Sequence, residues 1–290
     1  MNDRTSDPTA EECPRAAASV VLLRDGPQGL EVLLQRRHAQ SRVLGGLYVF
    51  PGGKVDDDDA DPAWAPLLDT PAAALTVPLA EPALSPAQAQ ALYVAAAREL
   101  WEEAGVALVD APERFSGVAR DAAALGWRQM LVAAGVRLRT QALRPWSRWI
   151  TPRRPPVGTP RFDTRFFLAR LPAGGHASHD AREMTDTLWL TPRQALQRYW
   201  AREIELIPPQ LMGLAELARH ADVASAWAAA AHRTPPCILP ETFDDGGERA
   251  ICYPGDARHP VRERALPGPT RLRWVGGRFE PYDGFEGWFR

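Results

Sequence analysis

The spacing of hydrophobic and polar residues along the chain predicts alternating strands and helices. Residues 16–23 are almost entirely apolar, as in a strand buried on both faces, and a turn containing Gly and Pro separates them from a second apolar run at 30–35. Shorter apolar runs predict strands at 47–50, 146–152 and 161–169, a strand that ends at 189–190, and a terminal hairpin at 271–282. Helical spacing predicts helices at 86–104, 116–134, 191–200, 208–219 and 223–231.

The first of these helices carries three acidic residues close to its end. Ser85 is a suitable N-cap for the helix, and Gly105 is the expected residue just beyond its last turn. Glu99, Glu102 and Glu103 share one face, because residues three and four apart are neighbours on a helix. Carboxylates this close repel one another unless a cation lies among them. The pattern therefore predicts either pairing with arginine or a metal site built from carboxylate oxygens.

Two segments upstream of this helix carry candidate binding groups. Gly52 and Gly53 follow a short apolar strand and are expected to break it and turn the backbone, since glycine allows positive φ and close approach. A basic stretch before that strand contains Arg36, Arg37 and Arg42 and is expected to form a loop. It is either a solvated loop or an anion-binding lip, because guanidinium groups match phosphate oxygens.

The acidic run at 56–61 does not match an EF-hand calcium loop. Counted from Asp57, the sixth position is Pro62 where the loop needs Gly, and the twelfth is Leu68 where it needs Glu. Residues 60–84 are rich in Pro, Ala and Leu without a clear period, so we expect an inserted loop with a short helical turn.

Composition excludes several classes of protein. The 290 residues are 45% hydrophobic and 24% charged, which is ordinary for a globular chain of one large or two smaller domains. A net charge of −2 argues against general binding to nucleic acid or membrane surfaces. The three cysteines form no CxxC pair, and no signal peptide or long apolar run is evident, so we expect a cytoplasmic protein.

Residues 98–106 resemble the signature of the Nudix hydrolases. The box of that family reads G-x5-E-x7-R-E-U-x-E-E-x-G-U, where U is a bulky aliphatic residue, and this segment matches every specified position of its second half. Gly53 lies 45 residues before Arg98 where the family has 14, so 31 residues are inserted. The first box glutamate falls on Asp59 when counted from Gly53 and on Gln90 when counted back from Arg98, and both positions remain open.

A second motif resembles the one that precedes the box in coenzyme A (CoA) diphosphatases, L-L-T-x-R-S-x3-R-x3-G-x3-F-P-G-G. Gln35 and His38 depart from it. The interrupted box, the segment WSRWITP at 146–152 and PPQ at 208–210 are similar to the peroxisomal acyl-CoA diphosphatase branch. The residues in register with the motif are Leu33, Leu34, Arg37, Arg42, Gly46, Phe50, Pro51, Gly52 and Gly53.

The resemblance implies a Nudix fold, an α/β/α sandwich with a mixed β-sheet. It implies a Nudix domain at 15–205 with insertions at 60–84 and 107–145. A helical and β-hairpin extension at 206–290 is expected to pack on that domain.

The resemblance also implies hydrolysis that depends on Mg²⁺ or Mn²⁺. Divalent cations held by carboxylates neutralise phosphate charge and activate water. Glu99, Glu102 and Glu103 are the expected catalytic metal ligands, and Arg98 is expected to orient a glutamate. The general base is either a box glutamate or Glu183, which lies on a later loop.

The implied substrate is the diphosphate of CoA or acyl-CoA, and the implied products are 3′,5′-ADP and 4′-phosphopantetheine or its acyl form. Arg36, Arg37 and Arg42 would bind the phosphates, together with Gly52 and Gly53. Two alternatives remain: a Nudix diphosphatase for ADP-ribose, dinucleotides or nucleotide sugars, and a non-catalytic Nudix-fold sensor. We expect no nucleic-acid or membrane partner, and a homodimer is left open.

Overall fold

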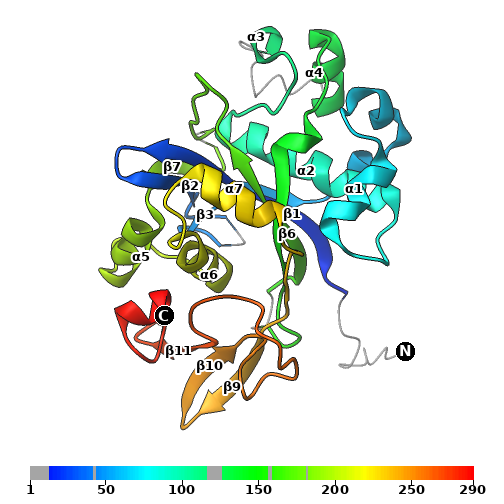
Figure 1. Cartoon of the computed structure of the whole chain (residues 1–290). Helices are drawn as coiled ribbons and strands as arrows, with labels where there is room; N and C mark the ends of the chain where they lie inside the picture. Colours follow the sequence, from blue (N-terminus) through cyan, green and yellow to red (C-terminus); the bar gives the residue numbers. More distant parts are fainter. Residues whose placement is uncertain (1–12, 42–43, 116–125, 156–158, 181) are drawn as a thin grey trace, which may run out of the picture.

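A mixed β-sheet forms the centre of the protein (Figure 1). The computed structural model describes residues 13–41, 44–115, 126–155, 159–180 and 182–290. Within these residues the sheet has eight strands. They are β1 (Arg15–Gly26), β2 (Gly29–Arg37), β3 (Tyr48–Val49), β4 (Gly52–Lys54), β5 (Leu143–Ile150), β6 (Phe162–Arg170), β7 (Met184–Leu190) and β8 (Cys237–Ile238).

The strand pairing places β1 at the middle of the sheet. The order is β3-β2-β1-β6-β5-β8, while β4 also pairs with β1 and β7 with β2. β1 runs parallel to β6 and antiparallel to β2 and β4. The predicted mixed sheet is therefore confirmed, and the strand predicted at 16–23 begins one residue earlier, at Arg15, and ends three residues later, at Gly26.

Helices cover both faces of the sheet, which confirms the predicted α/β/α arrangement (Figure 1). Val20 and Leu22 of β1 belong to the core beneath α2 (Pro86–Ala104), whereas Val21 and Leu23 face the opposite core. The opposite core is covered by α5 (Pro192–Trp200), α6 (Pro208–Leu217) and α7 (Val223–Ala231). Alternate residues of β1 are thus buried on both sides, as its continuous apolar sequence predicts.

The insertion that interrupts the box has more regular structure than the predicted loop. It contains two 3₁₀ helices, η1 (Asp57–Ala60) and η2 (Pro62–Leu67), and the helix α1 (Ala72–Leu79). Trp64, Leu75 and Leu79 are buried in the core beneath α2. Glu81, just after α1, joins the insertion to the sheet by ion pairs with Arg148 and Arg165 at 2.8 and 2.6 Å.

The described residues of the second insertion contain helices, as predicted. These are α3 (Pro112–Phe115), α4 (Trp127–Ala134) and the 3₁₀ helix η3 (Thr140–Ala142). The predicted helix at 116–134 is confirmed only for α4; residues 116–125, including Leu125, lie outside the described part of the chain. Trp127, Met130 and Leu131 are buried, as the apolar stripe predicts.

The C-terminal segment adds a second, antiparallel sheet of four strands in the order β12-β11-β10-β9. Its strands are β9 (Glu241–Asp245), β10 (Glu248–Cys252), β11 (Arg271–Val275) and β12 (Arg278–Glu280), followed by the 3₁₀ helix η4 (Phe285–Phe289). The predicted terminal hairpin corresponds to β11 and β12. Trp288 is fully buried in the core under α6, so this segment packs against the central body. No helix among the described residues is long and apolar enough to cross a membrane.

Candidate active site

The C-terminal turns of α2 carry the candidate acidic residues, and both helix ends form as predicted. The hydroxyl of Ser85 accepts a hydrogen bond from the Gln88 backbone N–H at 3.3 Å, and the Gln88 side chain accepts one from the Ser85 N–H at 2.9 Å. Gly105 ends the helix with φ of 69°, a conformation that glycine adopts without strain. Local sequence alone therefore sets where the acidic turns stop.

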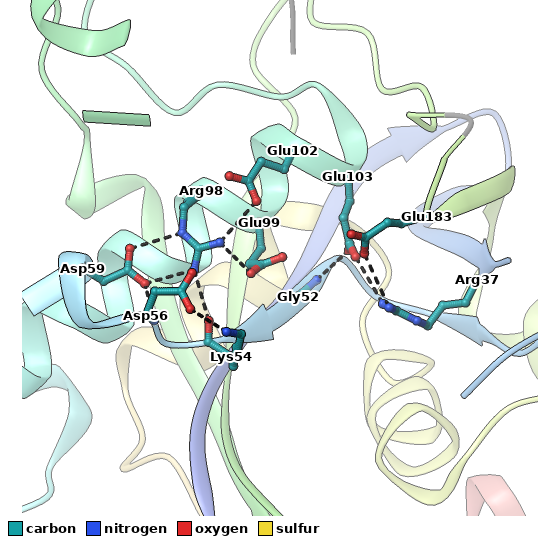
Figure 2. Close-up of polar contacts among 10 residues, drawn as sticks. All are labelled: Arg37, Gly52, Lys54, Asp56, Asp59, Arg98, Glu99, Glu102, Glu103 and Glu183. Carbon is teal, nitrogen blue, oxygen red and sulfur yellow. Dashed lines mark hydrogen bonds and ion pairs between the residues drawn. The ribbon is translucent and has the colours of Figure 1, made fainter. Parts of the chain in front are cut away.

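Arg98 contacts four carboxylates at one side of the site, those of Asp56, Asp59, Glu99 and Glu102 (Figure 2). Its Nε and Nη2 donate to Asp59 Oδ1 and Oδ2 at 3.2 and 3.0 Å. Its Nη1 donates to Glu99 at 2.7 Å and to Glu102 at 3.2 Å. The arginine thus contacts the glutamates that it is expected to orient, and its orienting role stays a prediction.

Asp59 pairs with Arg98, whereas Gln90 contacts the backbone of the insertion. Asp59 is only 2% exposed, although it belongs to an acidic run of the kind that is usually solvated. The Gln90 side chain donates to the backbone carbonyls of Asp59 and Asp61 at 3.4 and 3.0 Å. Of the two candidate positions for the first box glutamate, Asp59 therefore places a carboxylate against Arg98. Gln90 instead holds the backbone at the start of the insertion.

Glu103 lies on the other side of the site, near the end of β2 (Figure 2). It is 3% exposed, and its Oε2 accepts a hydrogen bond from the Gly52 N–H at 2.8 Å. Arg37 Nη1 donates to Glu103 Oε1 at 3.3 Å, and Arg37 Nη2 lies 3.6 Å from Glu183. The fold therefore brings Glu183, from the loop before β7, beside a box glutamate, as Figure 2 shows.

The two glycines are required for close packing rather than for a turn. The expected turn with positive φ is wrong: both residues lie in β4, and neither has positive φ. A Cβ on Gly52 would lie 2.6 Å from the Ala18 carbonyl oxygen and 2.7 Å from the Ser19 Cα. A Cβ on Gly53 would lie 2.4 Å from Glu99 Oε1, so this glycine makes room for the carboxylate.

The basic segment is only partly a loop. Arg36 and Arg37 are the last residues of β2, because pairing with β7 extends this strand beyond its apolar run. The Arg36 Nε donates to the Gly46 carbonyl at 3.3 Å, whereas Arg37 reaches the acidic residues. Arg42 lies outside the described residues.

Burial and mutual repulsion disfavour ionisation of the box glutamates. Burial raises the pKa of Glu99 to about 7; Arg98 opposes this rise, and the charge of Glu102 reinforces it. Burial also raises the pKa of Glu102. The pKa of Glu103 is raised well above its usual value by burial and by Glu99, against the Gly52 N–H and Arg37. The site therefore holds more acidic groups than its own arginines neutralise.

The chemistry of this donor set fits a hard divalent cation, because every candidate ligand is a carboxylate or backbone oxygen. The charge of Glu99 raises the pKa of Glu103, so a cation between the two carboxylates would relieve this repulsion. In the described part of the chain, however, no three acidic, histidine or cysteine side chains already converge on one point. Glu102 in particular faces Arg98 and is 46% exposed, so Glu99 and Glu103 are the better-placed pair.

One buried contact of the site was not anticipated from the sequence. Gln35 on β2 donates from Nε2 to the Glu103 carbonyl oxygen at 3.1 Å. The signal available in the sequence was a polar residue at an inward-facing position of an apolar strand, where the CoA diphosphatase motif has threonine.

Comparison with known proteins identifies the class that this fold and site define. The family model described as the NUDT19 Nudix domain matches residues 14–217. The crystal structure of a Nudix hydrolase from Alicyclobacillus acidocaldarius superposes with a TM-score of 0.57 at 28% identity, covering 74% of this chain and 96% of that one. The protein is a Nudix hydrolase.

The chain belongs to the NUDT19 Nudix domain family. The acyl-coenzyme A diphosphatase NUDT19 of Gallus gallus is 31% identical over 255 residues, which cover 70% of this chain and 68% of that protein. The protein of the same name from Xenopus laevis is 30% identical, with 67% of this chain and 61% of that protein covered. The chain thus spans about two thirds of the length of these relatives. Nudix hydrolases generally use divalent metal ions.

Proposed function

We propose that the protein hydrolyses the diphosphate of CoA or acyl-CoA in a reaction that depends on Mg²⁺ or Mn²⁺. The products are 3′,5′-ADP and 4′-phosphopantetheine or its acyl derivative. The observation that carries the proposal is the cluster of box carboxylates beside the buried Glu103, in a chain about 30% identical to proteins named acyl-coenzyme A diphosphatase. When bound, the divalent ion supplies charge neutralisation at the phosphate and an activated water.

In this proposal Glu99 and Glu103 are the main metal ligands, and Glu102 is a third ligand, directly or through water. Arg98 keeps Glu99 in place by its 2.7 Å hydrogen bond while its other nitrogens are held by Asp59. The backbone of Gly53 leaves space for the Glu99 carboxylate. Each of these residues acts by placing negative oxygen atoms where a cation can bind them.

The base that accepts the proton of the attacking water is assigned to Glu183 or to a box glutamate. Glu183 is 65% exposed, lies beside Glu103 and is held by Arg37 at 3.6 Å. An exposed carboxylate beside buried ligands can reach a water molecule that approaches from solvent. A Glu183→Gln variant that keeps full turnover leaves the role to the box glutamates.

The substrate phosphates are assigned to the arginines at the end of β2 and to the segment that follows it. Arg36, Arg37 and Arg42 form this basic segment in the sequence, and guanidinium groups bind phosphate oxygens in a bidentate manner. Arg37 is already engaged by Glu103 and Glu183, so substrate would bind to an arginine that also touches the catalytic acids. Arginine here therefore couples substrate binding to the position of the carboxylates.

Side-by-side turnover tests the substrate class. CoA, acetyl-CoA, ADP-ribose and NADH are incubated with the protein and Mg²⁺ or Mn²⁺, and the products are separated by chromatography. The proposal predicts the highest kcat/KM for CoA or acetyl-CoA, with 3′,5′-ADP as a product. Faster turnover of ADP-ribose would overturn the CoA assignment, and the absence of metal-dependent turnover of any diphosphate would favour a non-catalytic sensor.

A further inference from the structure

Three alternate residues of strand β2 face the side of the sheet that α2 covers. Leu33, Gln35 and Arg37 alternate with residues that face the opposite core, because neighbouring side chains of a strand point to opposite faces. Leu33 packs into the core beneath α2. Gln35 is fully buried, and Arg37 at the strand end is partly exposed. The row thus runs from the core to the catalytic carboxylates.

The C-terminal carbonyls of α2 need partners from outside the helix, since no following turn supplies N–H groups. The Ala104 carbonyl accepts a hydrogen bond from the Ser178 N–H at 3.0 Å. The Glu103 carbonyl accepts one from Gln35 Nε2 at 3.1 Å. The amide of Gln35 also donates to Thr187 Oγ1 on β7 at 3.4 Å. Gln35 therefore joins the catalytic end of α2 to two strands of the sheet.

The orientation of the Gln35 amide follows from these contacts. Nε2 faces two oxygen acceptors, so the reversed amide would place its oxygen against the Glu103 carbonyl. Oε1 is buried and has no hydrogen-bond partner among the described residues, which costs free energy. An apolar side chain of similar size would avoid this cost. What glutamine adds at this position is the donor to Glu103.

We propose that Gln35 is a positioning residue for Glu103. Gln35 fixes the Glu103 backbone through its carbonyl, while the Gly52 N–H and Arg37 fix its carboxylate, so both ends of one glutamate are held. The inference rests on the proposed function, because it takes Glu103 to be a metal ligand.

A Gln35→Met variant removes the donor and keeps nearly the same volume. Mn²⁺ binding is measured directly from the electron paramagnetic resonance signal of the free ion, and turnover of CoA is measured at saturating Mn²⁺. Changes in residues that orient metal ligands typically weaken metal binding or activity by about tenfold or more. We expect Mn²⁺ binding to weaken by about this factor. The Thr187→Val control keeps the Glu103 contact and should bind Mn²⁺ as the unmodified protein does.

Thermal unfolding separates positioning from a purely structural role. A Gln35→Met protein with a lower Tm but unchanged Mn²⁺ binding and kcat would overturn the inference. Should this variant not fold, Gln35→Asn takes its place: it keeps a buried amide but withdraws the donor by one methylene, and equal Mn²⁺ binding would overturn the inference in the same way. If the unmodified protein binds no Mn²⁺, the metal assignment itself fails. If the unmodified protein binds Mn²⁺ and the Gln35 variants bind it equally well, the positioning inference fails but the metal assignment stands.

Discussion

Replacement of Asp59 by asparagine tests whether the ion pair between Asp59 and Arg98, which lie on opposite sides of the insertion in the box, stabilises the protein. Asp59 is 2% exposed and accepts two hydrogen bonds from Arg98, whose side chain is 11% exposed. Breaking a buried ion pair by neutralising one partner costs about 3–5 kcal/mol. Because Arg98 keeps Glu99 and Glu102 as partners, we take the lower end, about 3 kcal/mol.

A loss of about 3 kcal/mol lowers Tm by about 5 °C in a chain of 290 residues, because the entropy of unfolding is about 2.1 cal/mol/K per residue. Arg98, without Asp59, should also bind Glu99 more closely and compete with a metal ion there. We therefore expect a lower Tm by circular dichroism and a higher Mn²⁺ concentration for half-maximal turnover. Asp57→Asn is the matched control, because Asp57 is exposed in the same acidic run.

The result that would refute this reasoning is an Asp59→Asn protein that matches the Asp57→Asn control in both Tm and Mn²⁺ requirement. In that case the contact between Asp59 and Arg98 would have no energetic role. The carboxylate of the interrupted box would then have to be sought elsewhere in the chain.

Two further predictions concern Glu99 and the glycines of β4. The folded pKa of Glu99 is about 7 against 4.5 for the free side chain, so its contribution to stability is present at low pH and is lost as pH rises through about 7. In EDTA, Glu99→Gln should therefore raise Tm at about pH 8 and leave it unchanged near pH 4; equal effects at both pH values would contradict this. Gly53→Ala should leave Tm nearly unchanged but reduce metal-dependent turnover, because its Cβ would lie 2.4 Å from Glu99 Oε1, on a side chain that can move. Gly52→Ala should cost about 1–3 kcal/mol of stability, because its Cβ would meet backbone atoms; the opposite ranking of the two variants would refute the packing argument.

The helix of the box was predictable because its signals are local. Ser85 and Gly105 mark its ends within the sequence, and the spacing of the three glutamates follows from helical geometry. The apolar runs predicted the strands for the same reason, whereas the mixed sheet was implied by the resemblance to the Nudix family. Features that depend only on residues one or two helical turns apart can be predicted without knowledge of the tertiary structure.

The remaining features depend on contacts between distant residues. Arg36 and Arg37 belong to β2 because they pair with β7, about 150 residues later in the chain, and Arg36 also pairs with Tyr48 of β3. The choice between Asp59 and Gln90 requires the path of the insertion, which the sequence pattern does not define. The close approach of Gly53 to Glu99 likewise exists only after β4 has packed against α2.

Turnover of CoA by the unmodified protein and by Glu103→Gln tests the central claim most directly. The variant keeps the size of the side chain, and circular dichroism establishes that it is folded. The account predicts release of 3′,5′-ADP by the unmodified protein with Mg²⁺ or Mn²⁺, none with EDTA, and a decrease of about 100-fold or more in the variant. A folded Glu103→Gln protein that hydrolyses CoA as fast as the unmodified protein would contradict it.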